Sequence, residues 1–173
     1  PFGEFIPFKP LFGWIIQVLN IPLSDFSRGS LDQQPLDLAG QKVAINICYE
    51  DVFGEEIILQ LPQASILVNV SNDAWFGRSI GPRQHLQISQ MRALETGRYM
   101  LRATNTGVTA IINERGQIVQ ELEMFVTQGL HGTAQGFKGA TPYVQYGNTL
   151  VLTIIGLCLS LGGFIAFFRK END

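Results

Sequence analysis

Apolar residues in the middle of the chain follow two patterns, short continuous runs and runs at helical spacing. The runs at 42–48 and 65–70 are rich in β-branched residues and end in polar segments, which is typical of buried strands. The segment 84–102 carries apolar residues at helical spacing and predicts a helix. The runs 107–113 and 117–122 flank the turn sequence NERG and predict a hairpin. Strands that alternate with helices indicate an α/β layer whose strands are covered on both faces.

The longest apolar run lies near the end of the chain. Thirty uncharged residues separate Lys138 from Arg169, and the part from 148 to 168 is almost entirely apolar. As a helix, this part would be about 31 Å long, which is enough to cross the hydrocarbon core of a bilayer. The sequence therefore predicts a transmembrane helix over 148–168. Cys158 lies in the middle of it and is expected to be a packing residue without chemistry.

The charges around this segment predict an orientation. Arg169 and Lys170 follow it directly, and positive charge prefers the cytoplasmic side of a membrane. We therefore expect residues 1–147 to form an extracytoplasmic domain on the periplasmic face, and 169–173 to form a cytoplasmic tail. A second apolar stretch, 2–19, is broken by prolines and is too short to span. It fits a segment lying in the membrane interface better than a covered core segment.

Composition, charge and the lack of certain motifs exclude several classes of partner and cofactor. Apolar residues make up 46% of the 173 residues, charged residues 16%, and the formal net charge is -3. This balance argues against a nucleic-acid partner, which requires a basic surface. We expect no metal and no cofactor, because neither a metal-ligand spacing nor a glycine-rich phosphate loop is present. His85 and His131 lack a distinguishing context and are interpreted as surface or satisfied histidines. The patterned start at Pro1 is typical of the C-terminal part of a longer protein.

Cys48 is the candidate for chemistry. It ends a predicted buried strand directly before a helix start, and α/β folds place ligands at the carboxyl ends of strands. Backbone N–H groups at a helix start can lower the pKa of a thiol and donate to an oxyanion. Glu50 and Asp51 oppose a thiolate, so a cationic partner would be needed. A small core residue is the alternative interpretation of Cys48.

Four motifs occur in order along the chain: PFGEFIPF at 1–8, ICYEDVFGE at 47–55, NVSNDAWFG at 69–77, and the long segment 81–116. Together they resemble the apolipoprotein N-acyltransferases, bacterial membrane enzymes with a nitrilase-type domain. The sequence YGNT before the final apolar segment also fits that family. The resemblance covers nearly the whole chain and is weakest at 17–41 and 123–140.

The resemblance implies a nitrilase-like α-β-β-α sandwich, of which this chain would hold the C-terminal part, followed by one transmembrane helix. It further implies a catalytic Glu, Lys and Cys, and Cys48 matches the nucleophile. Cys48 would attack an ester of a membrane phospholipid and hold the acyl chain as a thioester. The acyl chain would then pass to the α-amine of a diacylglyceryl-cysteine on a lipoprotein. The implied partners are therefore a phospholipid donor, a lipoprotein acceptor and the lipid bilayer of the inner membrane.

Further site residues follow from the same resemblance. Glu4 matches a second family glutamate that would orient the catalytic lysine. Tyr49 and Glu50 match positions beside the nucleophile, and for Glu50 a helix N-terminal charge is an equally good interpretation. Trp75 and Phe76 match a loop thought to border the lipid entrance, with a core aromatic as the alternative for Trp75.

One departure from the family matters for activity. The catalytic Lys and the general-base Glu of the family would both precede Pro1, so we predict that this chain alone is inactive. Two other functions stay open from the sequence. One is a membrane-tethered nitrilase-like amidohydrolase, in which water replaces the lipoprotein amine. The other is a noncatalytic, membrane-anchored binding module.

Overall fold

A single six-stranded sheet organises the part of the chain that the computed structural model describes, residues 29–30 and 32–170. Its strands lie side by side in sequence order, and β2, β3 and β4 are parallel while the other neighbours are antiparallel. The strands are β1 (Leu36–Leu38), β2 (Gln41–Ile47), β3 (Ile66–Ser71), β4 (Tyr99–Thr104), β5 (Ala110–Ile112) and β6 (Ile118–Glu121). Because β2, β3 and β4 are parallel, their carboxyl ends meet at one edge of the sheet.

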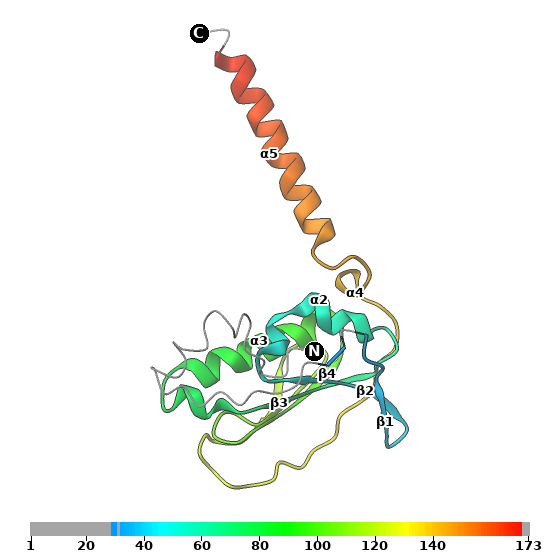
Figure 1. The fold of residues 1–173 in the computed structure, drawn as a ribbon, viewed down its shortest axis with the longest axis vertical. Helices are drawn as coiled ribbons and strands as arrows, with labels where there is room; N and C mark the ends of the chain where they lie inside the picture. Colours follow the sequence, from blue (N-terminus) through cyan, green and yellow to red (C-terminus); the bar gives the residue numbers. More distant parts are fainter. Residues whose placement is uncertain (1–28, 31, 171–173) are drawn as a thin grey trace.

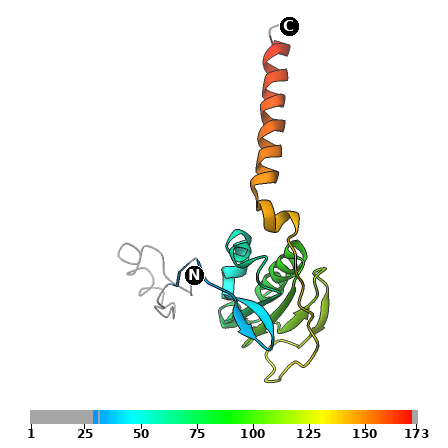
Figure 2. The same cartoon turned by 90° about the vertical axis from the view of Figure 1, so that its right-hand side faces the viewer.

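Helices α2 and α3 cover one face of the sheet, and α5 extends away from it (Figures 1 and 2). The helical elements are η1 (Cys48–Val52), α2 (Gly54–Ile57), η2 (Ile58–Gln60), η3 (Asp73–Phe76), α3 (Gly81–Thr96), α4 (Pro142–Tyr146) and α5 (Thr149–Lys170). The elements named η are short 3-10 turns. Segment 122–141 between β6 and α4 contains no regular element, in agreement with its glycine-rich sequence.

The strands 42–48 and 65–70 and the hairpin at 107–122 are confirmed. The helix predicted over 84–102 is confirmed to Thr96 and wrong over 97–102. The helix ends at Thr96 because Gly97 takes a left-handed conformation with φ 63°, and its N–H donates to Ala93 and Leu94 carbonyls. The chain then continues as β4, a strand that was not predicted.

The hydrophobic core lies between the sheet and the helices. Alternate residues of each strand point to the same face, so one residue set from each parallel strand meets α2 and α3. The core cluster contains Ala44, Leu67, Met100, Ala110 and Ile112 from the sheet and Ile57, Leu86 and Ala93 from the helices. Asn46, Asn69 and Arg102 belong to the same face of β2, β3 and β4, two residues further along each strand, and they are buried as well.

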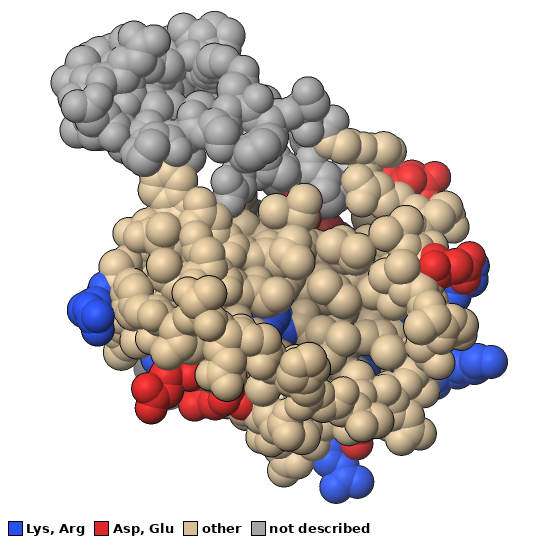
Figure 3. Space-filling model, turned by 90° about the horizontal axis from the view of Figure 1, so that it is seen from below, with Lys and Arg blue, Asp and Glu red and all other residues tan. Residues whose placement is uncertain are grey.

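The opposite face of the sheet presents apolar side chains that no helix of the described residues covers. Ile47 and Val70 are register partners on β2 and β3, and both are exposed, as are Leu36 and Leu38 on β1. Charged side chains lie mostly toward the edges of this face (Figure 3). One sheet with helices on one face corresponds to one half of the predicted sandwich. The second sheet stays a prediction.

The described side chains of α5 are exposed and include many large apolar ones. Within the described part of the chain, however, no helix combines the length and the apolar character that crossing a membrane requires. The transmembrane helix predicted over 148–168 is therefore not confirmed and stays a prediction. Glu4, the apolar stretch 2–19 and the last residues of the tail, 171–173, lie outside the described residues.

Candidate active site

Cys48 lies where β2 ends and the 3-10 turn η1 begins, at the carboxyl edge of the three parallel strands. Its backbone has a φ of 54°, in the left-handed region that costs an L-residue about 1–2 kcal/mol. The residue is 8% exposed. The predicted place of Cys48, at the end of a strand directly before a helical turn, is confirmed. A side chain held in a strained position at this edge is suited to act on a ligand bound there, but the part of Cys48 as a nucleophile stays a prediction.

Glu50 supports the backbone next to this turn. Its carboxylate accepts a hydrogen bond from the Ile47 N–H at 2.7 Å, and the residue is only 3% exposed. This contact is the one expected of a helix N-terminal charge, the alternative interpretation of Glu50. A part for Glu50 in catalysis stays a prediction. Glu4, the other predicted catalytic glutamate, lies outside the described residues.

The three aromatic residues predicted to bind substrate are all partly open to solvent. Trp75 and Phe76 are each 40% exposed on η3, so Trp75 is not a core aromatic. Tyr49 follows Cys48 directly and packs edge-on against Phe53, with ring centroids 6.0 Å apart. Phe76 packs in the same manner against His85. Their contact with a substrate stays a prediction.

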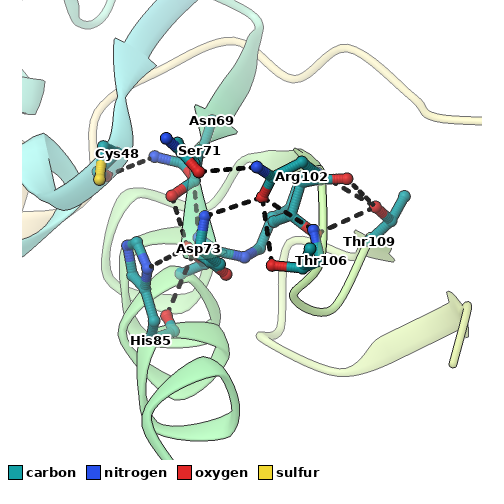
Figure 4. A network of polar contacts seen from close by, with 12 residues as sticks. Cys48, Asn69, Ser71, Asp73, His85, Arg102, Thr106 and Thr109 are labelled. Atoms are coloured by element: carbon teal, nitrogen blue, oxygen red, sulfur yellow. Dashed lines mark hydrogen bonds and ion pairs between the residues drawn. The ribbon is translucent and has the colours of Figure 1, made fainter. Parts of the chain in front are cut away.

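Asn69 connects η1, which we call the nucleophile turn after the role predicted for Cys48, to the neighbouring strands (Figure 4). Its side-chain amide donates to the Cys48 carbonyl at 2.9 Å and to Oδ1 of Asn46 at 2.6 Å. The side-chain oxygen of Asn69, Oδ1, accepts a hydrogen bond from Nη1 of Arg102 at 2.7 Å. Asn69 is fully buried, and these three contacts fix which way its amide points.

A charge network of Asp51, Asp73, His85 and Arg102 lies beneath the turn, and all four are buried. His85 on α3 places one ring nitrogen 2.9 Å from Oδ1 of Asp51 and the other 3.2 Å from Oδ1 of Asp73. Arg102 on β4 reaches Asp73 at 2.9 Å and Asp51 at 3.4 Å. Ser89 donates to Asp51 at 2.6 Å. The network therefore joins η1, η3, α3 and β4.

The charges in this network balance. Ionised carboxylates only accept hydrogen bonds, so the ring of His85, which faces one carboxylate on each side, must donate from both nitrogens and be positive. Burial opposes that charge, but the hydrogen bonds with Asp51 and Asp73 outweigh it and raise the pKa of His85 to about 9. Burial would likewise raise the pKa of Asp73, but the hydrogen bonds from His85 and Ser71 and the charge of Arg102 lower it to about 2. Two carboxylates thus face two cations.

The network corrects one electrostatic expectation. Asp51 was expected to oppose a thiolate at Cys48, but His85 and Arg102 neutralise its charge. His85 is a satisfied buried histidine, one of the two roles predicted for it. The parts of Asn69, Asp73 and Arg102 were missed, because no local spacing connects residues on separate strands and turns. The one available signal was Asn69, a polar residue inside the apolar run 65–70.

A polar groove of about 360 Å³ adjoins the end of the nucleophile turn, at the foot of α5. Arg92 and Glu95 form an ion pair of 2.7 Å in its wall, and burial raises the pKa of Glu95. Glu55 accepts a hydrogen bond from the Asn148 N–H at 3.0 Å, next to the first residue of α5. Among the described residues, no cluster of side chains is suited to hold a metal ion.

Known proteins resemble the chain in sequence and in fold. It is 80% identical over 172 residues to a protein of Nitrosomonas europaea named apolipoprotein N-acyltransferase, covering 99% of this chain and 35% of that protein. It is 54% identical to one of the same name from Chromobacterium violaceum, covering 98% of this chain and 33% of that protein. The chain thus spans about a third of the length of these relatives.

Among solved structures, the NitFhit protein of C. elegans has a similar fold. It matches with a TM-score of 0.52 at 18% identity, over 60% of this chain and 27% of that one. The likeness supports the predicted nitrilase-like α/β class. Residues 10–130 match the carbon-nitrogen hydrolase family, and this match contains β2, the nucleophile turn and the charge network. The chain belongs to the carbon-nitrogen hydrolase family.

Proposed function

We propose that this chain is the C-terminal part of a phospholipid-dependent acyltransferase that N-acylates bacterial lipoproteins. The observation that carries the proposal is the position of Cys48, a strained residue at the carboxyl edge of the parallel strands. The proposed reaction class, acyl transfer to an amine, comes from the two relatives described above, which are both named apolipoprotein N-acyltransferase. The family match supplies a domain in which a cysteine nucleophile fits.

The proposed chemistry has two half-reactions. The Cys48 sulfur attacks the carbonyl carbon of a phospholipid ester, and its proton is taken by the general-base glutamate that the family resemblance implies, which has no matching position in this sequence. The tetrahedral intermediate collapses to a thioester, and the lysophospholipid leaves as the alcohol by taking that proton from the base. The α-amine of a diacylglyceryl-cysteine then attacks the thioester carbonyl. An amide forms, the thiol is regenerated, and the proton lost by the amine returns through the same base.

The exposed aromatic residues support a lipid substrate. Trp75 and Phe76 lie on η3, which follows β3, the strand that pairs with the nucleophile strand. Aromatic side chains that are partly open to solvent suit contact with an acyl chain. We propose that Tyr49, Trp75 and Phe76 line the path of the acyl chain to Cys48, and that Glu50 assists the reaction in addition to its backbone contact.

A place at the inner membrane belongs to the same proposal. Residues 1–147 would lie on the periplasmic side, 148–168 would enter the bilayer, and the C-terminus would be cytoplasmic. The exposed apolar side chains along α5 support this arrangement, as do Arg169 and Lys170 at its end. The donor would be a membrane phospholipid and the acceptor a diacylglyceryl lipoprotein.

An assay with and without an acceptor tests the proposed reaction. The full-length protein in phospholipid vesicles is given a diacylglyceryl-cysteine peptide, and the products are analysed by mass spectrometry. We expect acyl transfer to the peptide amine and little free fatty acid. Release of fatty acid at the same rate with and without peptide would contradict transferase activity and favour the amidohydrolase alternative. Cys48→Ala should abolish transfer, whereas Cys158→Ala, which changes an exposed cysteine on α5, should retain it.

The isolated 173-residue chain should be inactive in the same assay. The family's lysine and general-base glutamate have no matching position in this sequence, so the Cys48 thiol would lack its base and its cationic partner. Acylation of Cys48 in the isolated chain would contradict this expectation.

A further inference from the structure

The charge network holds the nucleophile turn at two points. At the first, Asn69 donates to the Cys48 carbonyl at 2.9 Å, and Arg102 orients Asn69 through a contact of 2.7 Å. At the second, Asp51, the fourth residue of the same turn, contacts His85 at 2.9 Å. A five-residue turn fixed at its first and fourth residues has little freedom to relax.

Cys48 needs such support because of its backbone. An L-residue leaves the left-handed region readily unless its surroundings hold it there, and φ is 54° at Cys48. The direction of its side chain follows from that conformation. If the turn relaxed to negative φ, the sulfur would point away from its present position. A misplacement of an ångström can lower a rate by about 10²-fold.

We propose that the charge network, acting through Asn69, is a positioning unit that keeps Cys48 in its strained conformation. Asp73 belongs to this unit because its carboxylate contacts both cationic side chains, at Nδ1 of His85 and at Nη2 of Arg102. Within the network, each carboxylate contacts both His85 and Arg102. The role in catalysis rests on the proposed function of Cys48, whereas the effect on the turn is independent of it.

The decisive variants change Asn69, the uncharged side chain that joins Arg102 to the Cys48 carbonyl. Asn69→Asp keeps the size of the side chain and an acceptor for Arg102, but it cannot donate to the Cys48 carbonyl. Asn69→Leu removes the donor without adding a charge, so the two variants together separate loss of the hydrogen bond from a change in charge. Arg98→Lys is the matched control. Arg98 is also a buried arginine, but it donates to backbone carbonyls, among them that of Ala64 at 2.9 Å, outside the network.

Hydrogen exchange of the folded full-length protein measures the turn directly. In both Asn69 variants we expect the amides of 49–52 to exchange about tenfold faster or more, while those of β3 stay protected. Arg98→Lys should leave exchange at 49–52 unchanged relative to the rest of the protein. Unchanged exchange at 49–52 in folded Asn69 variants would overturn the proposal. Equal acceleration at 49–52 in the Arg98 variant would overturn it as well.

The rate of thioester formation gives the second readout. We expect the Asn69 variants to lower kcat by about 10²-fold with KM little changed, because the substrate still binds but the sulfur is misplaced. Wild-type kcat in a folded Asn69 variant would overturn the positioning role. If the wild-type protein forms no thioester, the proposed function fails, and hydrogen exchange still decides whether the network holds the turn.

Discussion

Cys48 and His85 show how the surroundings of a residue set its state. Cys48 adopts a backbone conformation that L-residues avoid, because neighbouring strands hold its carbonyl and its turn. His85 is charged although it is only 5% exposed, because a carboxylate faces each ring nitrogen. Both features depend on contacts between residues far apart in the sequence. Changes to single side chains therefore test them most directly.

The protonation of His85 predicts a pH-dependent stability. Because the pKa of His85 is raised from 6.5 to about 9 in the folded protein, its contribution is fully present below pH 6.5 and is lost as the pH rises toward 9. The loss should be about 3 kcal/mol or less in the free energy of unfolding. Denaturant unfolding between pH 6 and about 9.5 measures it.

His85→Gln should remove this part of the pH dependence and lower stability at pH 6. His131→Gln is the control, because His131 is exposed and lies in the loop after β6. A pH profile of the free energy of unfolding that is the same in the His85 variant and in the wild type would show that His85 does not carry the charge.

Glu50 allows its two roles to be separated. Glu50→Gln keeps an oxygen that can accept from the Ile47 N–H, so we expect the melting temperature to fall only slightly. If the carboxylate charge also assists the reaction, acyl transfer should fall by about 10²-fold, a size typical of general acid–base groups. Glu55→Gln, on the neighbouring helix α2, is the control and should retain activity. Full transfer activity in Glu50→Gln would contradict a part for the carboxylate in the reaction and leave Glu50 only its hydrogen bond with the Ile47 N–H.

At the scale of elements, the sequence predicts most of the sheet but little of the site. Continuous β-branched runs identified β2 and β3, and a turn signal identified the β5–β6 hairpin, because both signals are local. Strand β4 was missed because apolar residues at helical spacing continue to Met100, and because Arg98 and Arg102 do not look like buried residues in the sequence. Their burial depends on partners in other elements. The charge network escaped prediction for the same reason, whereas Cys48 was found because it lies at a strand end.

The loop between β4 and β5 gives a prediction at this scale. A Cβ added at Gly107 would collide with the carboxylate of Asp73. Gly107→Ala should therefore displace Asp73 from the network and destabilise the fold by about 1–3 kcal/mol, as overpacking does. Gly129→Ala, where an added Cβ would meet its nearest neighbour at an ordinary 3.6 Å, should change stability by less than about 0.5 kcal/mol. Equal melting temperatures for the two variants would contradict the packing argument.

At the scale of the whole molecule, two apolar surfaces remain uncovered in the described structure. One is the sheet face that carries Ile47 and Val70, and the other is the length of α5. The exposed sheet face is suited to pack against the other sheet of the predicted sandwich. The exposed side chains of α5 are suited to contact lipid. Large exposed apolar surfaces mark sites of contact with a protein or a membrane. Both surfaces are available for the contacts that the proposed function requires, with the rest of the domain and with a membrane.

The proposed orientation predicts which parts of the protein are open to the periplasm. A protease site inserted in the loop 132–135 should be cleaved when protease is added outside spheroplasts, whereas a tag after Asp173 should be protected. Cleavage of the C-terminal tag in intact spheroplasts would contradict the proposed orientation. Opening the spheroplasts before digestion provides the control, because both sites should then be cut.

The proposed function requires that Cys48 carries the acyl chain. The most direct measurement is the intact mass of the full-length protein after incubation with phospholipid vesicles, before and after treatment with neutral hydroxylamine. We predict an increase by one acyl group that hydroxylamine removes, that peptide mapping places on Cys48, and that persists in Cys158→Ala. No adduct, or an adduct that remains in Cys48→Ala, would contradict the account.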